Sequence, residues 1–254
     1  NGHHQCVELL LDRGANVNAV GIDNITPLHF ASYNGHHQCI ELLLDRHANI
    51  DAVDSDNNTP LHHASSNGHH QCVELLLDRH ANINAVDSDN STPLHWASVN
   101  GHHQCVELLL DRGANVNAVT VVNRTPLHYA SGNGYHQCIE LLLDRHANVN
   151  AVGIDNRTPL YCASVNGHHQ CVELLIDRGP DKSIKDVRED GRDSLLIFLD
   201  MNHLSSNPLD PQLNGKTAEQ VARTPKIAQL IRDRGILINL SIYLSIYLSI
   251  YLSI

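Results

Sequence analysis

Apolar and polar residues recur along this chain with a period of 33 residues, the distance from Thr26 to Thr59. Each period predicts two short helices. In the first, Thr26 can act as the N-cap, Pro27 fits the first turn, and Leu28 and Ala31 share one face. The repeated segments of this helix are "TPLHFAS", "TPLHHAS", "TPLHWAS", "TPLHYAS" and "TPLYCAS", starting at Thr26, Thr59, Thr92, Thr125 and Thr158.

The second helix of each period carries "QC" followed by "ELLLDR" or a close variant. Cys39, Leu42 and Leu43 lie at helical spacing and predict its apolar face. Asn34-Gly35 separates the two helices. The position after Asp-Arg favours a left-handed residue, which is glycine in some copies and histidine in others: Gly14, Gly113, Gly179, His47, His80 and His146.

Segments rich in Asp and Asn, such as "DSDNNT" and "DSDNST", predict turns between the periods. One helix pair cannot bury its apolar face alone, so the periods must stack on one another. The pattern therefore predicts an all-α repeat solenoid built of helix–turn–helix units.

These motifs together resemble the ankyrin repeat: Thr-Pro-Leu-His-x-Ala, Asn-Gly-His, Glu-Leu-Leu-Leu and Ala-Asn-Val-Asn-Ala. The resemblance covers residues 1–185 and implies an ankyrin helix–turn–helix stack with β-turn fingers. The family's finger glycine is Asn here, at Asn24, Asn57, Asn90, Asn123 and Asn156, and Asn tolerates the left-handed region. Tyr161 replaces the usual histidine of the last full unit, which puts that unit's polar bridge in doubt.

The period also suggests the domain organisation. The ankyrin stack of residues 1–185 divides into a partial unit at 1–20 and full units at 21–53, 54–86, 87–119, 120–152 and 153–185. Residues 186–235 read as degenerate C-terminal repeats that cap the stack. Residues 236–254 form a low-complexity tail of repeated "YLSI".

Two interpretations of the tail stay open. A strict four-residue repeat is what a tetranucleotide tract gives when translated, and transcript sequencing across the 3′ end would test this. The rival is a membrane anchor, since 236–254 carries no charge and approaches the ~20 apolar residues of a spanning helix. Four serines and the lack of a basic flank argue against the anchor.

Charge and cysteine spacing limit the possible functions. A formal net charge of −11 disfavours nucleic acid as a partner, because phosphate binding needs clustered Lys and Arg. Six of the seven cysteines recur once per period, and equivalent positions in stacked helices lie roughly 8–10 Å apart. That is beyond the ~4.4–6.8 Å separation of Cα atoms in a disulfide, so reduced, core-filling cysteines are expected.

The recurring "HHQC" could in principle hold a metal ion or a Cys/His nucleophile. A structural zinc site needs four ligands, and one helix supplies two or three. Catalysis needs one site with an orienting third group, whereas this segment occurs in near-identical copies. We therefore interpret "HHQC" as architecture and expect no catalytic residue, cofactor or metal.

The positions that differ between units are the candidate site. The resemblance places the fingers and the first helices on a concave, partner-binding face. Three alternatives to partner binding stay open. The aromatic row of Phe30, His63, Trp96 and Tyr129 could pack between adjacent first helices, the aspartates could stabilise the turns, and the differences could be drift between copies. The predicted groove residues are Phe30, Tyr33, Asp56, His63, Asp89, Trp96, Arg124, Tyr129 and Arg157, beside an acidic middle that also includes Asp54 and Asp87.

The main hypothesis is a non-enzymatic scaffold that binds a partner protein. We expect this scaffold to be a monomer located in the cytoplasm or the nucleus. The alternative is a regulatory or targeting ankyrin segment of a larger signalling, channel or ubiquitin-ligase-type protein. The chain begins at Asn1 in mid-pattern, so an upstream secretory signal or domain stays open. "LLDRGANVNA" also resembles the substrate motif of asparaginyl hydroxylases, which implies candidate sites at Asn18, Asn84, Asn117 and Asn150.

Overall fold

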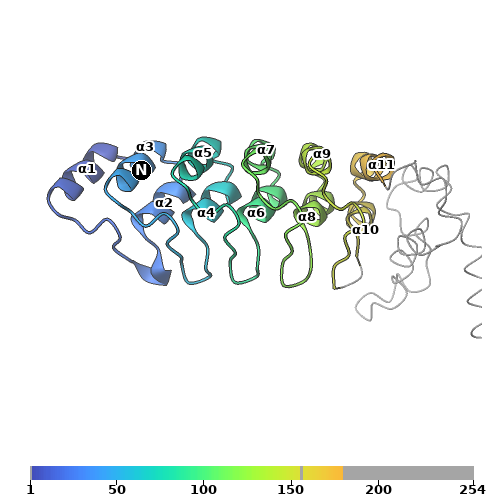
Figure 1. The fold of residues 1–254 in the computed structure, drawn as a ribbon, viewed down its shortest axis with the longest axis horizontal. Coiled ribbons are helices and arrows are strands. Elements are labelled where there is room, and N and C mark those ends of the chain that lie inside the picture. Colours follow the sequence, from blue (N-terminus) through green and yellow to red (C-terminus); the bar gives the residue numbers. More distant parts are fainter. Residues whose placement is uncertain (1, 155–156, 180–254) are drawn as a thin grey trace, which may run out of the picture. The chain divides into compact units, whose positions relative to one another are not determined.

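The structure, a computed structural model, describes residues 2–154 and 157–179. Those residues form eleven α-helices and one short 3₁₀ helix, with no strand among them (Figure 1). The chain divides into two compact units, Asn1–Asn148 and Val149–Ile254, and each is described by itself. The degenerate repeats predicted at 186–235 and the tail at 236–254 lie outside the described residues.

Each predicted period contributes a first helix that begins at its proline and a second helix that begins just before its glutamine. The first unit contains α1 (His4–Asp12), the 3₁₀ helix η1 (Ile22–Asn24), and the pairs α2 (Pro27–Tyr33) with α3 (His37–Asp45), α4 (Pro60–Ser66) with α5 (His70–Asp78), α6 (Pro93–Val99) with α7 (His103–Asp111), and α8 (Pro126–Asn133) with α9 (His136–Asp144). The second unit contains α10 (Pro159–Val165) and α11 (His169–Asp177). The predicted helix pairs are confirmed.

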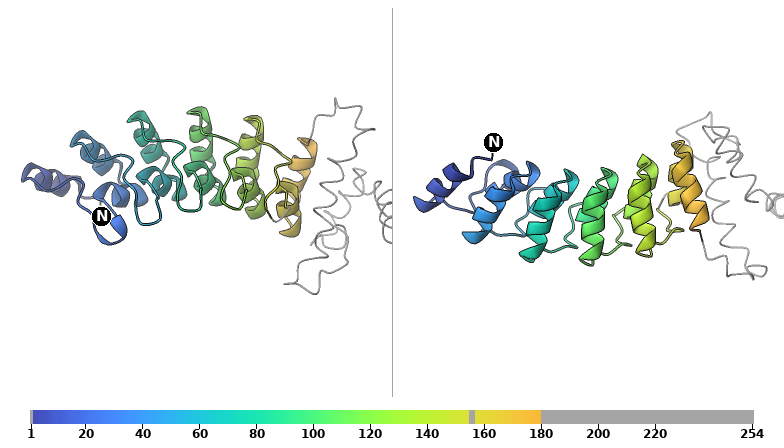
Figure 2. Two further views of the ribbon diagram at one scale, coloured as in Figure 1. Left: turned by 60° about the horizontal axis from the view of Figure 1, so that its bottom comes forward. Right: turned by 90° about the horizontal axis from the view of Figure 1, so that it is seen from above.

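Within the first unit the helices form two rows. The first helices α2, α4, α6 and α8 pack side by side, and so do the second helices α1, α3, α5, α7 and α9 (Figure 2). Each first helix also packs on the second helix of its own pair. The loops that join one pair to the next project from the side of the first helices (Figure 1). This arrangement confirms the all-α repeat solenoid.

Aliphatic residues at equivalent positions fill the space between the rows. In α2 the buried apolar residues are Leu28 and Ala31, and in α3 they are Cys39, Ile40 and Leu43. The predicted face of α3 was partly wrong, because Leu42 is only half-buried and Ile40 takes its place. Ile40 and Leu43 lie three residues apart, and Cys39 and Leu43 lie four apart, so the buried stripe keeps helical spacing but is rotated round the helix from the predicted one.

Threonine and histidine close the start of each first helix in the first unit. In α6 the Nδ1 atom of His95 accepts a hydrogen bond from the backbone N–H of Thr92 at 3.0 Å and lies 2.9 Å from the Thr92 hydroxyl. The hydroxyl in turn caps the backbone N–H of His95, which completes a capping box with histidine at the third position. The same box is present at Thr26, Thr59 and Thr125.

The other nitrogen of these histidines links neighbouring repeats. The Nε2–H of His95 donates to the backbone carbonyl of Arg124 in the next loop at 3.1 Å. His29 and His62 make the same bond to Asn58 and Ser91. Nδ1 is the acceptor and Nε2 the donor, so the structure needs the neutral ring in one tautomer. In the second unit Tyr161 occupies this position, and its backbone N–H still donates to Thr158 Oγ1 at 3.2 Å.

Left-handed residues end the second helices, largely as predicted. Gly14 and Gly113 have φ of 84° and 86°, and His47, His80 and His146 adopt the same region at 65°, 68° and 64°. The prediction for Gly179 was wrong, since it is not among the residues with positive φ. Pro180 follows it, and a residue before proline is driven towards extended backbone.

The recurring cysteines are small core residues, as expected. Cys39, Cys72, Cys105, Cys138 and Cys171 are buried and unpaired, whereas Cys6 in α1 is exposed. Burial raises the pKa of the Cys72 thiol to about 11 and that of Cys105 to about 12. These thiols are therefore protonated and unreactive at neutral pH.

Candidate functional site

The candidate site is the surface made by the first helices α2, α4, α6 and α8 together with the loops that precede them, which we call the groove face. The loops, here called fingers, cover residues 16–25, 49–58, 82–91 and 115–124. Phe30 and Tyr33 lie on α2, and Asp56 lies in the finger before α4. His63, Trp96 and Tyr129 lie on α4, α6 and α8, with Asp89 and Arg124 in the fingers between them. Arg157 belongs to the second unit, where its guanidinium lies 5.2 Å from the ring centroid of Tyr161.

Each finger is held in shape by its own backbone and by its neighbour. Asn57 and Asn90 sit at the left-handed positions predicted for them, with φ of 62° and 61°. The Ser88 N–H donates to the carbonyl of Asp56 in the preceding finger at 2.8 Å, and the Val121 N–H donates to that of Asp89 at 2.9 Å. These bonds fix the spacing of adjacent fingers.

Two buried aspartates organise the middle fingers. One carboxylate oxygen of Asp87 accepts from the backbone N–H groups of Asp89 and Ser91, at 2.9 and 2.7 Å. Asp54 does the same for Asp56 and Asn58, at 2.9 and 2.8 Å. The two side chains are only 8% and 7% exposed, so the turn interpretation is confirmed for this pair.

The second oxygen of each aspartate binds the variable ring on the following helix. Trp96 donates its indole N–H to Asp87 at 2.9 Å, and His63 Nε2 lies 3.0 Å from the carboxylate of Asp54. Burial opposes ionisation of Asp54, but backbone and side-chain hydrogen bonds outweigh it and lower its pKa. The rings of His63 and Trp96 are thus oriented from the finger.

Sequence reasoning missed this link between finger and helix. A signal for it exists in the repeats themselves. The two units with Asp at the sixth position of the finger, Asp54 and Asp87, carry a ring with an N–H nine residues later. The units with Gly21, Thr120 or Gly153 at that place carry Phe, Tyr or Cys instead.

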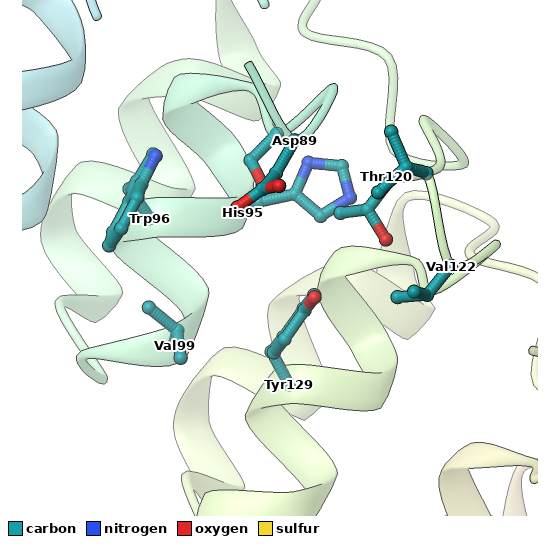
Figure 3. A pocket seen from close by; sticks show the side chains of 9 residues that line it. Asp89, His95, Trp96, Val99, Thr120, Val122 and Tyr129 are labelled. Carbon is teal, nitrogen blue, oxygen red and sulfur yellow. The ribbon is translucent and has the colours of Figure 1, made fainter. Parts of the chain in front are cut away.

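A pocket of about 270 Å³ opens on the groove face between α6 and α8. Trp96 and Val99 form one wall and Tyr129 the other, with His95 between them and Asp89, Thr120 and Val122 of the fingers at the rim (Figure 3). Three predicted groove residues, Asp89, Trp96 and Tyr129, therefore meet around one hollow.

The other predicted groove residues do not line this pocket. Phe30 and Tyr33 are 62% and 54% exposed, while His63 is half-buried with its ring 6.0 Å from that of Tyr33. Asp56 is exposed on its finger, and Arg124 is half-buried. Packing between first helices thus accounts for part of the burial of His63, Trp96 and Tyr129 but leaves the side chain of Phe30 mainly in solvent.

The predicted hydroxylation sites also link repeats. The Oδ1 atoms of Asn18, Asn84 and Asn117 accept from the backbone N–H of the asparagine that opens the next finger, at 2.8, 2.9 and 2.8 Å. Asp51 makes the same bond with Asn82 at 2.9 Å. These side chains therefore tie each loop to the next one, and hydroxylation stays a prediction. Asn150 is half-buried in the second unit.

Neither a metal cluster nor a membrane-spanning helix is found in the part of the chain that the structure describes. Among residues 2–154 and 157–179, no three His, Cys, Asp or Glu side chains are grouped so as to hold a metal ion. In the same residues no helix has the length and apolar character needed to cross a membrane.

Comparison with known protein families gives matches along most of the chain. A family model described as ankyrin repeats (3 copies) matches residues 46–120 and 119–186. A second, described as ankyrin repeats (many copies), matches residues 1–44. No curated protein matches the sequence.

Proposed function

This chain belongs to the ankyrin-repeat family, and from that membership we propose that it is a non-enzymatic scaffold that binds a partner protein through the groove face. Ankyrin repeats are in general protein–protein interaction modules. Fold membership alone does not assign a role to one surface, so the proposal depends on what this surface carries.

The observation that carries the proposal is the pocket between Trp96 and Tyr129. Its walls are aromatic and aliphatic, it opens on the face where the repeats differ, and the ring of Trp96 is fixed by Asp87. Aromatic side chains in a pre-formed hollow are the typical anchors of protein interfaces. Phe30 and Tyr33 extend the exposed aromatic surface along the same face.

Affinity capture from cell lysate tests this proposal. A groove variant with Phe30→Ala, Tyr33→Ala and Tyr129→Ala should lose a protein that the native chain captures. A matched control with Gln38→Ala, Gln71→Ala and Gln104→Ala, which changes exposed positions on the second helices, should retain it. Quantitative mass spectrometry gives the readout, and circular dichroism shows that both variants are folded. Equal capture by the groove variant and the control would contradict the proposal.

Hydroxylation of the loop asparagines is a separate proposal about the same repeats. Asn84 and Asn117 are exposed, and their Oδ1 atoms face the next finger's backbone, which leaves the Cβ atom as the place for an added oxygen. In cells that contain an asparaginyl hydroxylase we expect peptides spanning Asn84 to gain the mass of one oxygen. The peptide spanning Asp51 is the internal reference, because this unit has aspartate where the others have the candidate asparagine. Peptides that stay unmodified in those cells would dismiss the idea.

A further inference from the structure

The carboxylate of Asp89 stands at the rim of the Trp96–Tyr129 pocket. It is exposed, and among the described residues its side chain makes no hydrogen bond or ion pair. The backbone of Asp89 is fully used, since its N–H binds Asp87 and its carbonyl binds Val121. The fold therefore needs the backbone of this residue and leaves its charge available.

None of the residues that line the pocket is a lysine or an arginine. His95 uses both ring nitrogens, one on Thr92 and one on the carbonyl of Arg124. The Thr120 hydroxyl accepts from the backbone N–H of Arg124 at 3.3 Å. The indole N–H of Trp96 is taken by Asp87. A ligand that enters the pocket would have to neutralise Asp89 itself.

The surroundings of the pocket are acidic on the side of the preceding repeats. Asp23 and Asp56 occupy the same finger position as Asp89, and both are exposed. The fingers at 16–25, 49–58 and 82–91 contain no Lys or Arg. Such a row of like charges attracts a cationic segment and disfavours an anionic one.

We propose that this pocket receives an arginine side chain from a basic segment of the partner, with the guanidinium between the rings of Trp96 and Tyr129 and paired with Asp89. The inference rests on the proposed function and specifies the chemistry of the partner. Further basic residues of the segment lie along Asp56 and Asp23.

Arginine fits this arrangement better than the other candidates. Its planar guanidinium stacks on aromatic faces and presents two parallel donors to a carboxylate. Lysine carries a strongly hydrated point charge that gains less from two flat walls. An aliphatic side chain would fill the hollow but would remove water from Asp89 without replacing its hydrogen bonds.

Trp96 is the only tryptophan of the chain, so its single indole N–H resonance reports occupation of this pocket. The experiment titrates the ¹⁵N-labelled full chain with acetyl-Gly-Arg-Gly-Arg-Gly-amide. Two comparison peptides, with Lys or Leu in place of both Arg residues, are titrated in the same way. We expect a saturable shift of the Trp96 signal with the arginine peptide and binding at least about tenfold weaker with the other two.

Asp89→Asn removes the charge with little change of shape and should weaken the arginine peptide about tenfold. Glu107→Gln, which removes an exposed charge on the second helix α7 of the same repeat and outside the groove face, is the matched control and should leave the Trp96 titration unchanged. Tyr129→Leu should weaken binding while the Trp96 signal of the free protein shows that the repeat is folded.

Four results would overturn the inference: native affinity in Asp89→Asn, lysine binding as tightly as arginine, no response of Trp96 to any peptide, or a saturable response to the leucine peptide alone. The last result would leave the proposed function in place, because the pocket would then bind an apolar anchor. Failure of the proposed function is seen separately, as equal capture by the groove variant and its control.

Discussion

Acidification from pH 6.5 to 4 is expected to destabilise the helix stack of residues 2–148 strongly. The cause is the histidine at the third position of the first helices. Burial lowers the pKa of His29 and His62, and lowers the pKa of His95 to about 4. In His95 the bonds to Arg124 and Ala118 and the charge of Asp87 oppose this shift, and the charge of His62 adds to it.

The sign follows from proton binding. Between pH 6.5 and 4 the unfolded chain binds a proton at His95 that the folded chain excludes, so the free energy of unfolding falls as the pH falls. The contribution is fully present above pH 6.5 and is lost by about pH 4. For His95 the loss is about 3 kcal/mol over this window, at about 1.4 kcal/mol per pH unit. His29 and His62 act in the same direction.

The hydrogen bonds give the same answer independently. Nδ1 of His95 accepts from Thr92 N–H, and a protonated ring would turn that acceptor into a donor facing another donor. Protonation therefore breaks the capping box and also buries a charge in a side chain that is 2% exposed.

Urea unfolding followed by circular dichroism at pH 7.5, 6.5, 5.5 and 4.5 measures the effect. The unfolding free energy should be level between the first two points and fall steeply below them. His95→Gln should reduce the slope by about one proton, and His103→Gln, at an exposed position, should not. A flat profile down to pH 4.5 would show that these histidines are not the buried neutral groups described here.

The repeat period predicts the helix pairs and most of the left-handed positions, because these depend on one repeat or on two identical neighbours. The helix pairs follow from the spacing of Leu28 and Leu43, because every full unit buries the same two positions. The left-handed residues follow from single positions such as Asn57 and His80, whose backbone geometry is local. The family resemblance then places the variable positions on one face.

The features that escape prediction depend on a side chain reaching across a loop. Nothing in the hydrophobic pattern shows that Asp87 turns inward to bind Trp96 while Asp89, two residues later, turns outward. The difference arises because the carboxylate of Asp87 accepts hydrogen bonds from the backbone N–H groups of Asp89 and Ser91 and so closes the finger. The sequence pattern alone treats the two carboxylates as equivalent.

Substitution of Gly68 by alanine is expected to destabilise the stack by about 3 kcal/mol. Gly68 joins α4 to α5 with φ of 73°, so any side chain is strained there. A Cβ atom would also lie 2.5 Å from Nδ1 of His102 in the next repeat. That ring cannot move aside freely, because its Nε2–H donates to the carbonyl of Ser66 at 3.0 Å. Overpacking of this kind costs about 1–3 kcal/mol beyond the backbone term.

Gly113 provides the matched control for the backbone term. Its φ is 86°, and a Cβ atom there meets nothing within 4 Å. Gly113→Ala should therefore lower the free energy of unfolding by only about 1 kcal/mol. The equivalent residue of the preceding repeat, His80, shows that a side chain is tolerated at this position. The difference between the two variants in urea unfolding isolates the contact between repeats.

A double-mutant cycle completes the test. His102→Ala removes the ring that a Cβ atom at residue 68 would strike, so the cost of Gly68→Ala should fall in that background by at least about 1 kcal/mol. The same contact recurs where Gly35 meets His69 and where Gly101 meets Tyr135. If Gly68→Ala costs the same unfolding free energy in both backgrounds, glycine is required there only for its backbone conformation. A positive coupling would show that the glycine and the first residue of "HHQC", the recurring sequence signature of this chain, act together to fix the spacing of adjacent repeats.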